Sequence, residues 1–126
     1  MRALLILLLL LVQLPAANAC SCFPPEVQAR TAQEALQKSS LAVYGRVVEV
    51  AASGQARILV LESFKGPSAG SVLDAGPNSG QCETPPFLFG EEILVLSFSE
   101  MVTACDKYPR EHYLLDALRS IAEKGK

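Results

Sequence analysis

The stretch Leu41-Ala-Val-Tyr-Gly-Arg-Val-Val-Glu-Val50 is rich in β-branched residues and predicts the first strand of the chain. Gly45 lies in its middle, where a glycine indicates a bulge or a bend. The segment Ala51-Ala-Ser-Gly-Gln55 predicts a turn, and the apolar run from Ala56 to Phe64 predicts a second strand. These two strands are expected to pair as a hairpin.

Three more short strands are expected after the hairpin. Their predicted ranges are 71–75, 91–98 (opened by Gly90) and 101–105. A loop rich in Gly, Pro, Asn and Ser, from Gly76 to Pro86, separates the first two and contains Cys82. Five short strands in a small chain favour a mainly β domain, a closed or nearly closed barrel with helices packed on the outside.

Two helices are predicted to flank these strands. The first covers residues 26–38 and ends at Ser39-Ser40, and the second covers residues 109–123 and is closed by Gly125. Each has apolar residues at helical spacing. These are Ala32, Ala35 and Leu36 in the first helix, and Leu114, Leu118 and Ile121 in the second.

Residues 1–19 have the features of a secretory signal peptide. Arg2 provides the positive start, Ala3 to Val12 is an unbroken apolar run, and Ala17-Asn18-Ala19 matches the small-x-small cleavage pattern. The apolar run is shorter than the roughly 20 residues that a membrane-spanning helix needs. The sequence therefore predicts export, to the cell exterior or a periplasm, of a single mature domain over residues 20–126.

The charge of this domain limits its partners. Cleavage removes one basic residue, Arg2, and so changes the formal net charge of −2 for the full sequence to −3. Nucleic-acid binding depends on basic patches, and anionic membrane surfaces attract basic proteins. We therefore expect neither as a partner. The only histidine, His112, lies near the start of a predicted surface helix and is expected to be solvated, so nothing indicates a Ser-His-Asp catalytic arrangement.

Cleavage before Cys20 would leave four cysteines, which are Cys20, Cys22, Cys82 and Cys105. An even number of cysteines in an exported chain predicts two disulfides. A bond between Cys20 and Cys22 would close a strained ring. Two connectivities remain open: Cys20–Cys82 with Cys22–Cys105, and the crossed alternative. Both tie the new N-terminus to two distant parts of the chain, and Pro24-Pro25 stiffens the segment that follows.

A set of motifs, taken in order, resembles one known family. The motifs are Cys20-Ser21-Cys22, Ala42-Val-Tyr-Gly-Arg-Val-Val48, Phe64-Lys65-Gly66, Cys82, Gly90-Glu-Glu-Ile-Leu-Val95 and Cys105. In this order, and with a Cys-x-Cys at the cleavage site itself, they resemble the N-terminal inhibitory domain of the tissue inhibitors of metalloproteinases, within the netrin-like module superfamily. The resemblance extends over nearly all of residues 20–126.

The resemblance implies both a fold and an activity. The fold would be an OB-like five-stranded Greek-key barrel with flanking helices, stapled by Cys20–Cys82 and Cys22–Cys105. The chain would not be an enzyme and would need no cofactor of its own. It would inhibit a zinc metalloendopeptidase, because the α-amine and carbonyl oxygen of Cys20 would chelate the zinc of that target and the Ser21 side chain would enter its specificity pocket.

The implied contact surface is a ridge, which we call the inhibitory ridge. It consists of Cys20, Ser21, Cys22, Phe23, Gln81 and Cys82. Each of these residues also has a simpler interpretation. Cys20 would then be an ordinary half-cystine, Ser21 a small residue between two disulfides, Phe23 a packing residue, and Gln81 part of a loop.

The chain departs from the family pattern in several ways. The third disulfide of the inhibitory domain and the cysteine-rich second domain are absent from this sequence, and the turn after the first strand is short. A non-inhibitory netrin-like binding module outside the cell is therefore the alternative function. A lipid-anchored form of that module is a third interpretation, and it alone would give the chain a membrane partner. Ala17-Asn18-Ala19-Cys20 is a poor lipobox, because leucine is expected three residues before the cysteine.

Overall fold

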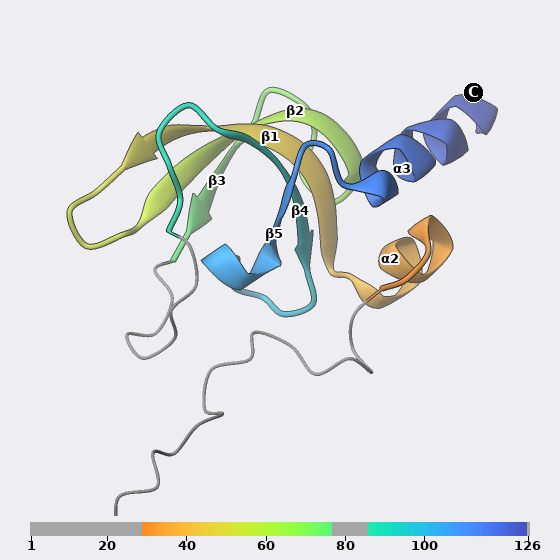
Figure 1. Cartoon of the computed structure of the whole chain (residues 1–126), viewed down its shortest axis with the longest axis horizontal. Helices are drawn as coiled ribbons and strands as arrows, with labels where there is room; N and C mark the ends of the chain where they lie inside the picture. Colours follow the sequence, from red (N-terminus) through yellow and green to blue (C-terminus); the bar gives the residue numbers. More distant parts are fainter. Residues whose placement is uncertain (1–28, 77–85, 126) are drawn as a thin grey trace, which may run out of the picture.

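The computed structural model describes residues 29–76 and 86–125, and it is mainly β (Figure 1). Five strands form one antiparallel sheet in the order β3-β2-β1-β4-β5. The strands are β1 (Leu41–Val50), β2 (Ala56–Lys65), β3 (Val72–Ala75), β4 (Glu92–Ser97) and β5 (Lys107–Pro109). Two α-helices, α2 (Ala32–Lys38) and α3 (Tyr113–Lys124), and one 3₁₀ turn, η1 (Ala104–Asp106), complete the described fold.

β1 is the central strand, and it pairs with both β2 and β4. Its register against β2 shifts between Tyr44 and Gly45, which confirms the irregularity that the glycine predicted. A Cβ atom at Gly45 would lie 2.6 Å from the carbonyl oxygen of Leu59 and 2.7 Å from Cγ2 of Ile58. A larger residue would therefore push the two strands apart at this bulge.

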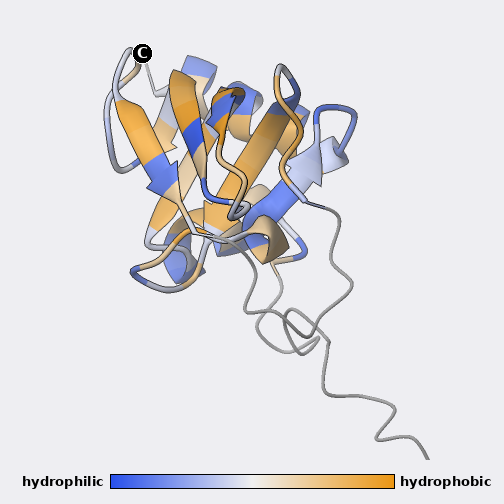
Figure 2. Ribbon diagram, turned by 90° about the vertical axis from the view of Figure 1, so that its left-hand side faces the viewer, coloured by the Kyte–Doolittle hydropathy of each residue, from blue (hydrophilic) through white to orange (hydrophobic). Residues whose placement is uncertain are grey.

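The hydrophobic core has two parts, one on each face of the sheet, and much of the sheet is accordingly coloured as apolar in Figure 2. Neighbouring residues of a strand alternate between them: Val43 and Val95 belong to one cluster, and Tyr44 and Leu94 to the other. Within the curve of the sheet, Phe87, Val102 and Ala104 complete the first cluster. The second cluster is covered by the two helices, which lie side by side at one end of the sheet (Figure 1).

The two helices begin later than the sequence predicted. α2 begins at Ala32 and not at Glu26, because Thr31 is extended and its side chain caps the helix by accepting a hydrogen bond from the Glu34 amide (3.1 Å). Residues 29–31 are not helical, and the earlier part of the predicted helix lies outside the described residues. α3 begins at Tyr113 and not at Pro109, because Pro109 is the last residue of β5.

The predicted fifth strand over residues 101–105 is wrong. Val102 makes a single parallel bridge to Ala75, Ala104–Asp106 form η1, and β5 follows at Lys107–Pro109. The reason is a capping box, in which the Thr103 side chain accepts a hydrogen bond from the turn and the Asp106 side chain accepts one from the Thr103 amide. The predicted ends of helix α2 at Ser39 and of helix α3 at Gly125 are confirmed.

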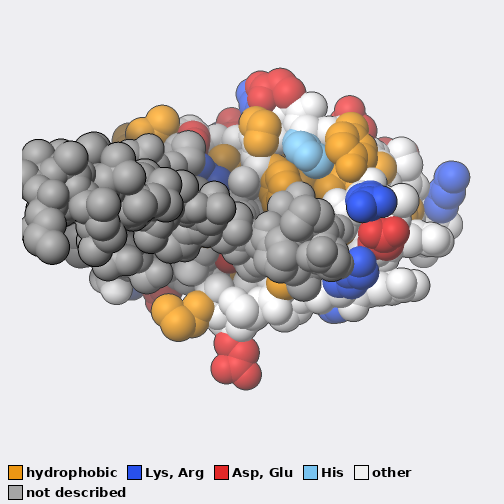
Figure 3. Space-filling view, turned by 60° about the horizontal axis from the view of Figure 1, so that its bottom comes forward, with side chains coloured by type: hydrophobic (Ala, Val, Ile, Leu, Met, Phe, Trp, Pro, Cys, Tyr) orange, Lys and Arg blue, Asp and Glu red, His pale blue; other side chains and the backbone are white. Residues whose placement is uncertain are grey.

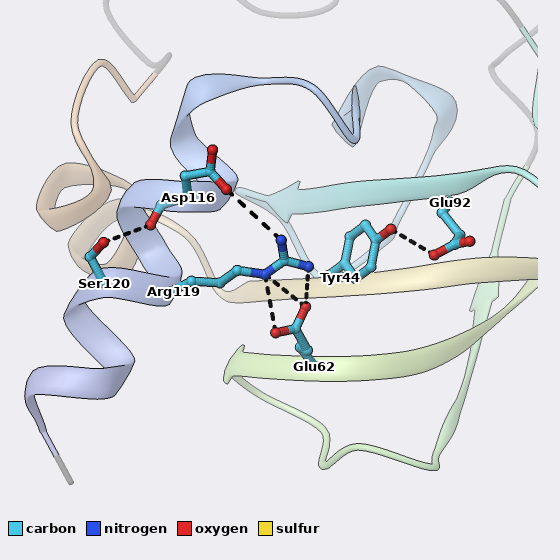
Figure 4. A network of polar contacts seen from close by, with 6 residues as sticks. All are labelled: Tyr44, Glu62, Glu92, Asp116, Arg119 and Ser120. Carbon is cyan, nitrogen blue, oxygen red and sulfur yellow. Dashed lines mark hydrogen bonds and ion pairs between the residues drawn. The ribbon is translucent and has the colours of Figure 1, made fainter.

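A polar network joins α3 to the sheet (Figure 4). The Arg119 guanidinium donates hydrogen bonds to both carboxylate oxygens of Glu62 on β2 (2.6–3.1 Å). The same guanidinium lies over the ring of Tyr44, 5.1 Å from the ring centroid, and the Tyr44 hydroxyl donates to Glu92 (2.7 Å). This brace fixes α3 across β1 and β2.

Candidate functional site

The structure describes one cysteine of the predicted disulfide framework, Cys105. Cys105 lies at the centre of η1 and is partly buried. The inhibitory ridge itself, Cys20 to Phe23 with Gln81 and Cys82, lies outside the described residues. Cys105 is not without a partner, and both of the cysteines predicted to pair with it, Cys20 and Cys22, fall in that undescribed part. The pairing therefore stays a prediction.

The turn that carries Cys105 is held by short-range hydrogen bonds. The Cys105 amide donates to the Thr103 hydroxyl (3.2 Å), the Asp106 amide donates to the Thr103 carbonyl (3.0 Å), and the Thr103 amide donates to Oδ2 of Asp106 (2.8 Å). The backbone amides of Thr103, Cys105 and Asp106 are therefore all held in place around the cysteine. A half-cystine held in this way gives a cross-link a defined point of attachment.

Asp106 is a buried carboxyl group directly after Cys105. Only 1% of its surface is exposed, and Oδ1 has no hydrogen-bond partner among the described residues. Burial raises the pKa of Asp106 from 3.8 to about 6, against the opposing effect of the hydrogen bond from the Thr103 amide. The turn therefore contains a group that changes its charge in mildly acidic conditions.

The described residues on either side of the Cys82 segment are tied to the chain around η1. On one side the Gly76 amide donates to the carbonyl of Val102 (2.8 Å). On the other side Nζ of Lys107 donates to the carbonyl of Pro86 (2.7 Å) and forms an ion pair with Glu91 (3.0 Å). Gly76 and Pro86, the described residues that flank segment 77–85, are therefore both hydrogen-bonded to the short stretch of chain that carries Cys105.

The start of the described chain is anchored against helix α3. Ala29 is buried in the cluster beneath the helices, and the Tyr113 hydroxyl donates to the Arg30 carbonyl (2.8 Å). The chain that follows the inhibitory ridge is therefore tied down near the junction of β5 and α3. No local sequence pattern predicts this contact, because Arg30 and Tyr113 are 83 residues apart.

His112 is not freely solvated, contrary to the prediction. It is the N-cap of α3, where Nδ1 accepts a hydrogen bond from the Leu114 amide (3.3 Å), and it is partly buried. Its ring packs edge-on against Tyr108 and stacks on Tyr113, and Figure 3 shows hydrophobic side chains on both sides of the histidine. Burial lowers the pKa of His112 and so favours the neutral ring that can accept the capping hydrogen bond.

A groove of about 480 Å³ opens at the edge of the sheet beside Gly76. We call it the seam groove, because it lies where the end of β3 meets the segment before η1. It is lined by Glu49, Ala51, Gln55, Ala56, Arg57, Asp74, Ala75, Gly76, Glu100, Met101 and Val102. Sequence reasoning missed this site, because segments far apart in the chain contribute to it and none has a motif of its own.

Within residues 29–76 and 86–125, no cluster of three or more His, Cys, Asp or Glu residues could hold a metal ion. Among those same residues, no helix has the length and apolar character needed to cross a bilayer.

The chain matches no model of a known protein family, and no curated protein is significantly similar to it in sequence.

Proposed function

We propose that the chain is a secreted or periplasmic inhibitor of zinc metalloendopeptidases. In this proposal the mature chain begins at Cys20, and the α-amine and carbonyl oxygen of Cys20 chelate the catalytic zinc of the target. The disulfides Cys20–Cys82 and Cys22–Cys105 hold the inhibitory ridge in place. The observation that carries the proposal is the position of Cys-x-Cys directly after the predicted cleavage site.

The sheet supports an OB-like barrel as the finer fold. In the order β3-β2-β1-β4-β5, a barrel would close by bringing the two edge strands, β3 and β5, together. A parallel bridge between Ala75, at the end of β3, and Val102, in the segment that leads through η1 to β5, lies at this seam. Curvature of β1 at the Gly45 bulge also favours closure, since bulges increase the twist and bending of a strand.

The arrangement around Cys105 supports the ridge. Gly76 and Pro86, which flank the segment containing Cys82, are both hydrogen-bonded to residues close to η1. A second cross-link from the N-terminus to Cys105 would then draw Cys20 and Cys22 toward the same region. Two disulfides and Pro24-Pro25 would order the N-terminus before binding, which lowers the entropy cost of forming a complex.

The chemistry of the proposed contact is straightforward. A catalytic zinc ion has three protein ligands and one open position, which a water molecule occupies before reaction. An amine and the carbonyl of the same residue form a five-membered chelate ring at such a metal and displace that water. The α-amine has a reference pKa near 8, so the neutral, coordinating form is accessible at neutral pH.

The proposal is tested by the chemical state of the mature N-terminus. Intact mass and N-terminal sequencing of the natively exported protein should give a chain that starts at Cys20 with a free amine and weighs four hydrogens less than the reduced chain. This protein should inhibit members of a panel of zinc metalloendopeptidases. One added alanine before Cys20 should abolish inhibition, and enzymatic removal of that alanine should restore it.

Two results would overturn the proposal. A diacylglyceryl group on Cys20, or additional residues before it in the natural protein, would leave the lipid-anchored or purely binding module as the function. Equal inhibition with and without the added alanine would show that the Cys20 amine does not reach the zinc.

A further inference from the structure

The seam groove has the size and the lining of a binding site. Its volume of about 480 Å³ lies within the range of roughly 300–1,000 Å³ that is usual for ligand pockets. Small apolar side chains line part of it: Ala51, Ala56, Ala75 and Val102. Met101, which is 67% exposed, adds a flexible apolar surface at the rim.

The lining of the groove contains more acidic than basic side chains. Arg57 lies between Glu49 (3.9 Å) and Asp74 (3.4 Å), which are its neighbours across β1 and β3. Glu100 is the third carboxylate of the lining, and it makes no ion pair with any described residue. Three carboxylates and one guanidinium give the lining a formal charge of −2.

We propose that the seam groove binds a basic side chain, arginine or lysine, that a partner polypeptide presents. The aliphatic stem would lie along Met101 and the alanine-lined wall, and the cationic head would pair with Glu100 and the carboxylates beside Arg57. Long basic side chains suit such a mixed site, because their stems are apolar and only their ends are charged. The proposal does not depend on protease inhibition, and it applies equally to a non-inhibitory binding module.

Charge complementarity selects this occupant over others. An anion would have to approach three carboxylates in order to reach Arg57, which already has two acidic neighbours. A purely apolar side chain would leave Glu100 facing it without a counter-charge. A side chain with an apolar stem and a positively charged end can contact the apolar wall and also pair with the carboxylates of the groove.

The test uses the disulfide-bonded mature protein and a minimal probe. N-acetyl-arginine amide is titrated into ¹⁵N-labelled protein, and the amide shifts of the groove residues are followed by NMR. N-acetyl-citrulline amide, which has nearly the same shape and no charge, is the matched ligand. We expect saturable shifts confined to the groove with the arginine probe, weaker binding at high salt, and no such shifts with citrulline.

Variants assign the effect to the groove. Glu100→Gln should weaken binding of the arginine probe about threefold to fivefold, as expected for the loss of one exposed ion pair. Glu123→Gln, which makes the same change of charge at the exposed end of α3, should leave the affinity unchanged. Equal shifts with arginine and citrulline, no saturable shifts at the groove, or equal effects of the two substitutions would each overturn the proposal.

Discussion

Gly45 and Leu59 approach so closely across the β1–β2 bulge that a Cβ atom on Gly45 would lie 2.6 Å from the carbonyl oxygen of Leu59. The obstacle is backbone, so it cannot move aside as a side chain would. Gly45→Ala should therefore lower the free energy of unfolding by about 1–3 kcal/mol, the usual cost of overpacking. Urea unfolding of the disulfide-bonded protein measures this loss.

Gly76→Ala is the matched control for that substitution. A Cβ atom there would meet its nearest neighbour, Cε of Met101, at 3.6 Å, which is ordinary contact. Its free energy of unfolding should stay within about 0.5 kcal/mol of the wild type. Equal losses in the two variants would show that crowding at the bulge is not the cause.

The raised pKa of Asp106 predicts that the protein loses stability as the pH rises through the mildly acidic range. Its pKa is raised from 3.8 to about 6 by burial, so within this window the folded protein keeps a proton that the unfolded chain has released. Its contribution to the free energy of unfolding should therefore fall as the pH rises from about 4 to about 6. Asp106→Asn should remove this fall and stabilise the protein at pH 7 by about 1–3 kcal/mol.

Urea unfolding at several pH values measures the difference between wild type and Asp106→Asn. Asp74→Asn, which removes the same formal charge at an exposed position on β3, is the control variant. If Asp106→Asn proved less stable than wild type at every pH, the carboxylate would have a favourable partner, and the prediction would be wrong.

The lowered pKa of His112 predicts a dependence of stability on pH that is opposite in sign to that of Asp106. The folded protein lowers the pKa of His112, so the unfolded chain takes up the proton first on acidification. The contribution of His112 to stability should be complete above about pH 6.5, the reference pKa of histidine, and should decrease as the pH falls through the lower pKa of the folded state. Protonation also removes the acceptor that caps α3.

His112→Asn separates this effect from that of Asp106. Asparagine is a good N-cap and does not titrate, so helix α3 should keep its start. The dependence of stability on pH below about pH 6.5, the reference pKa of histidine, should change in this variant, as measured by thermal or urea unfolding. An unchanged slope would mean that the ring of His112 does not provide the cap.

The ion pair of Arg119 with Glu62 should contribute measurably to stability because it is bidentate. Both side chains are about 40% exposed, so solvent screening limits the coupling to about 1 kcal/mol or less. A double-mutant cycle of Arg119→Met and Glu62→Gln gives this coupling energy. The longer pair Glu34–Lys38 (3.7 Å), within helix α2, should give a smaller value. A coupling no larger than that of the helix pair would contradict the brace described here.

The central strands were predictable because their signals are local. The runs that became β1, β2 and β4 are apolar and rich in β-branched residues, and the turn between the first two was evident from its composition. The last strand was misplaced. Val102 and Ala104 looked like parts of a strand, but Thr103 and Asp106 cap each other, and this local pair outweighed strand propensity.

The contacts that position α3 and the seam groove could not be predicted in the same way. Tyr44 and Glu92 are 48 residues apart, and Glu62 and Arg119 are 57 residues apart. Such pairs meet only when the order of strands in the sheet is known. The predicted ridge residues depend instead on the resemblance, because Cys20 and Cys82 lie outside the described residues.

The anchoring of Gly76 to Val102 and of Pro86 to Lys107 has a consequence for engineering. Both anchors use backbone carbonyls as acceptors, so they do not depend on which residues are placed between them. Foreign loops could therefore be grafted between Gly76 and Pro86, and a twofold increase in loop length should cost only about 0.6 kcal/mol in closure entropy. With the predicted Cys20–Cys82 disulfide, the choice to keep or replace Cys82 in such grafts would decide whether a displayed peptide is cross-linked or left open.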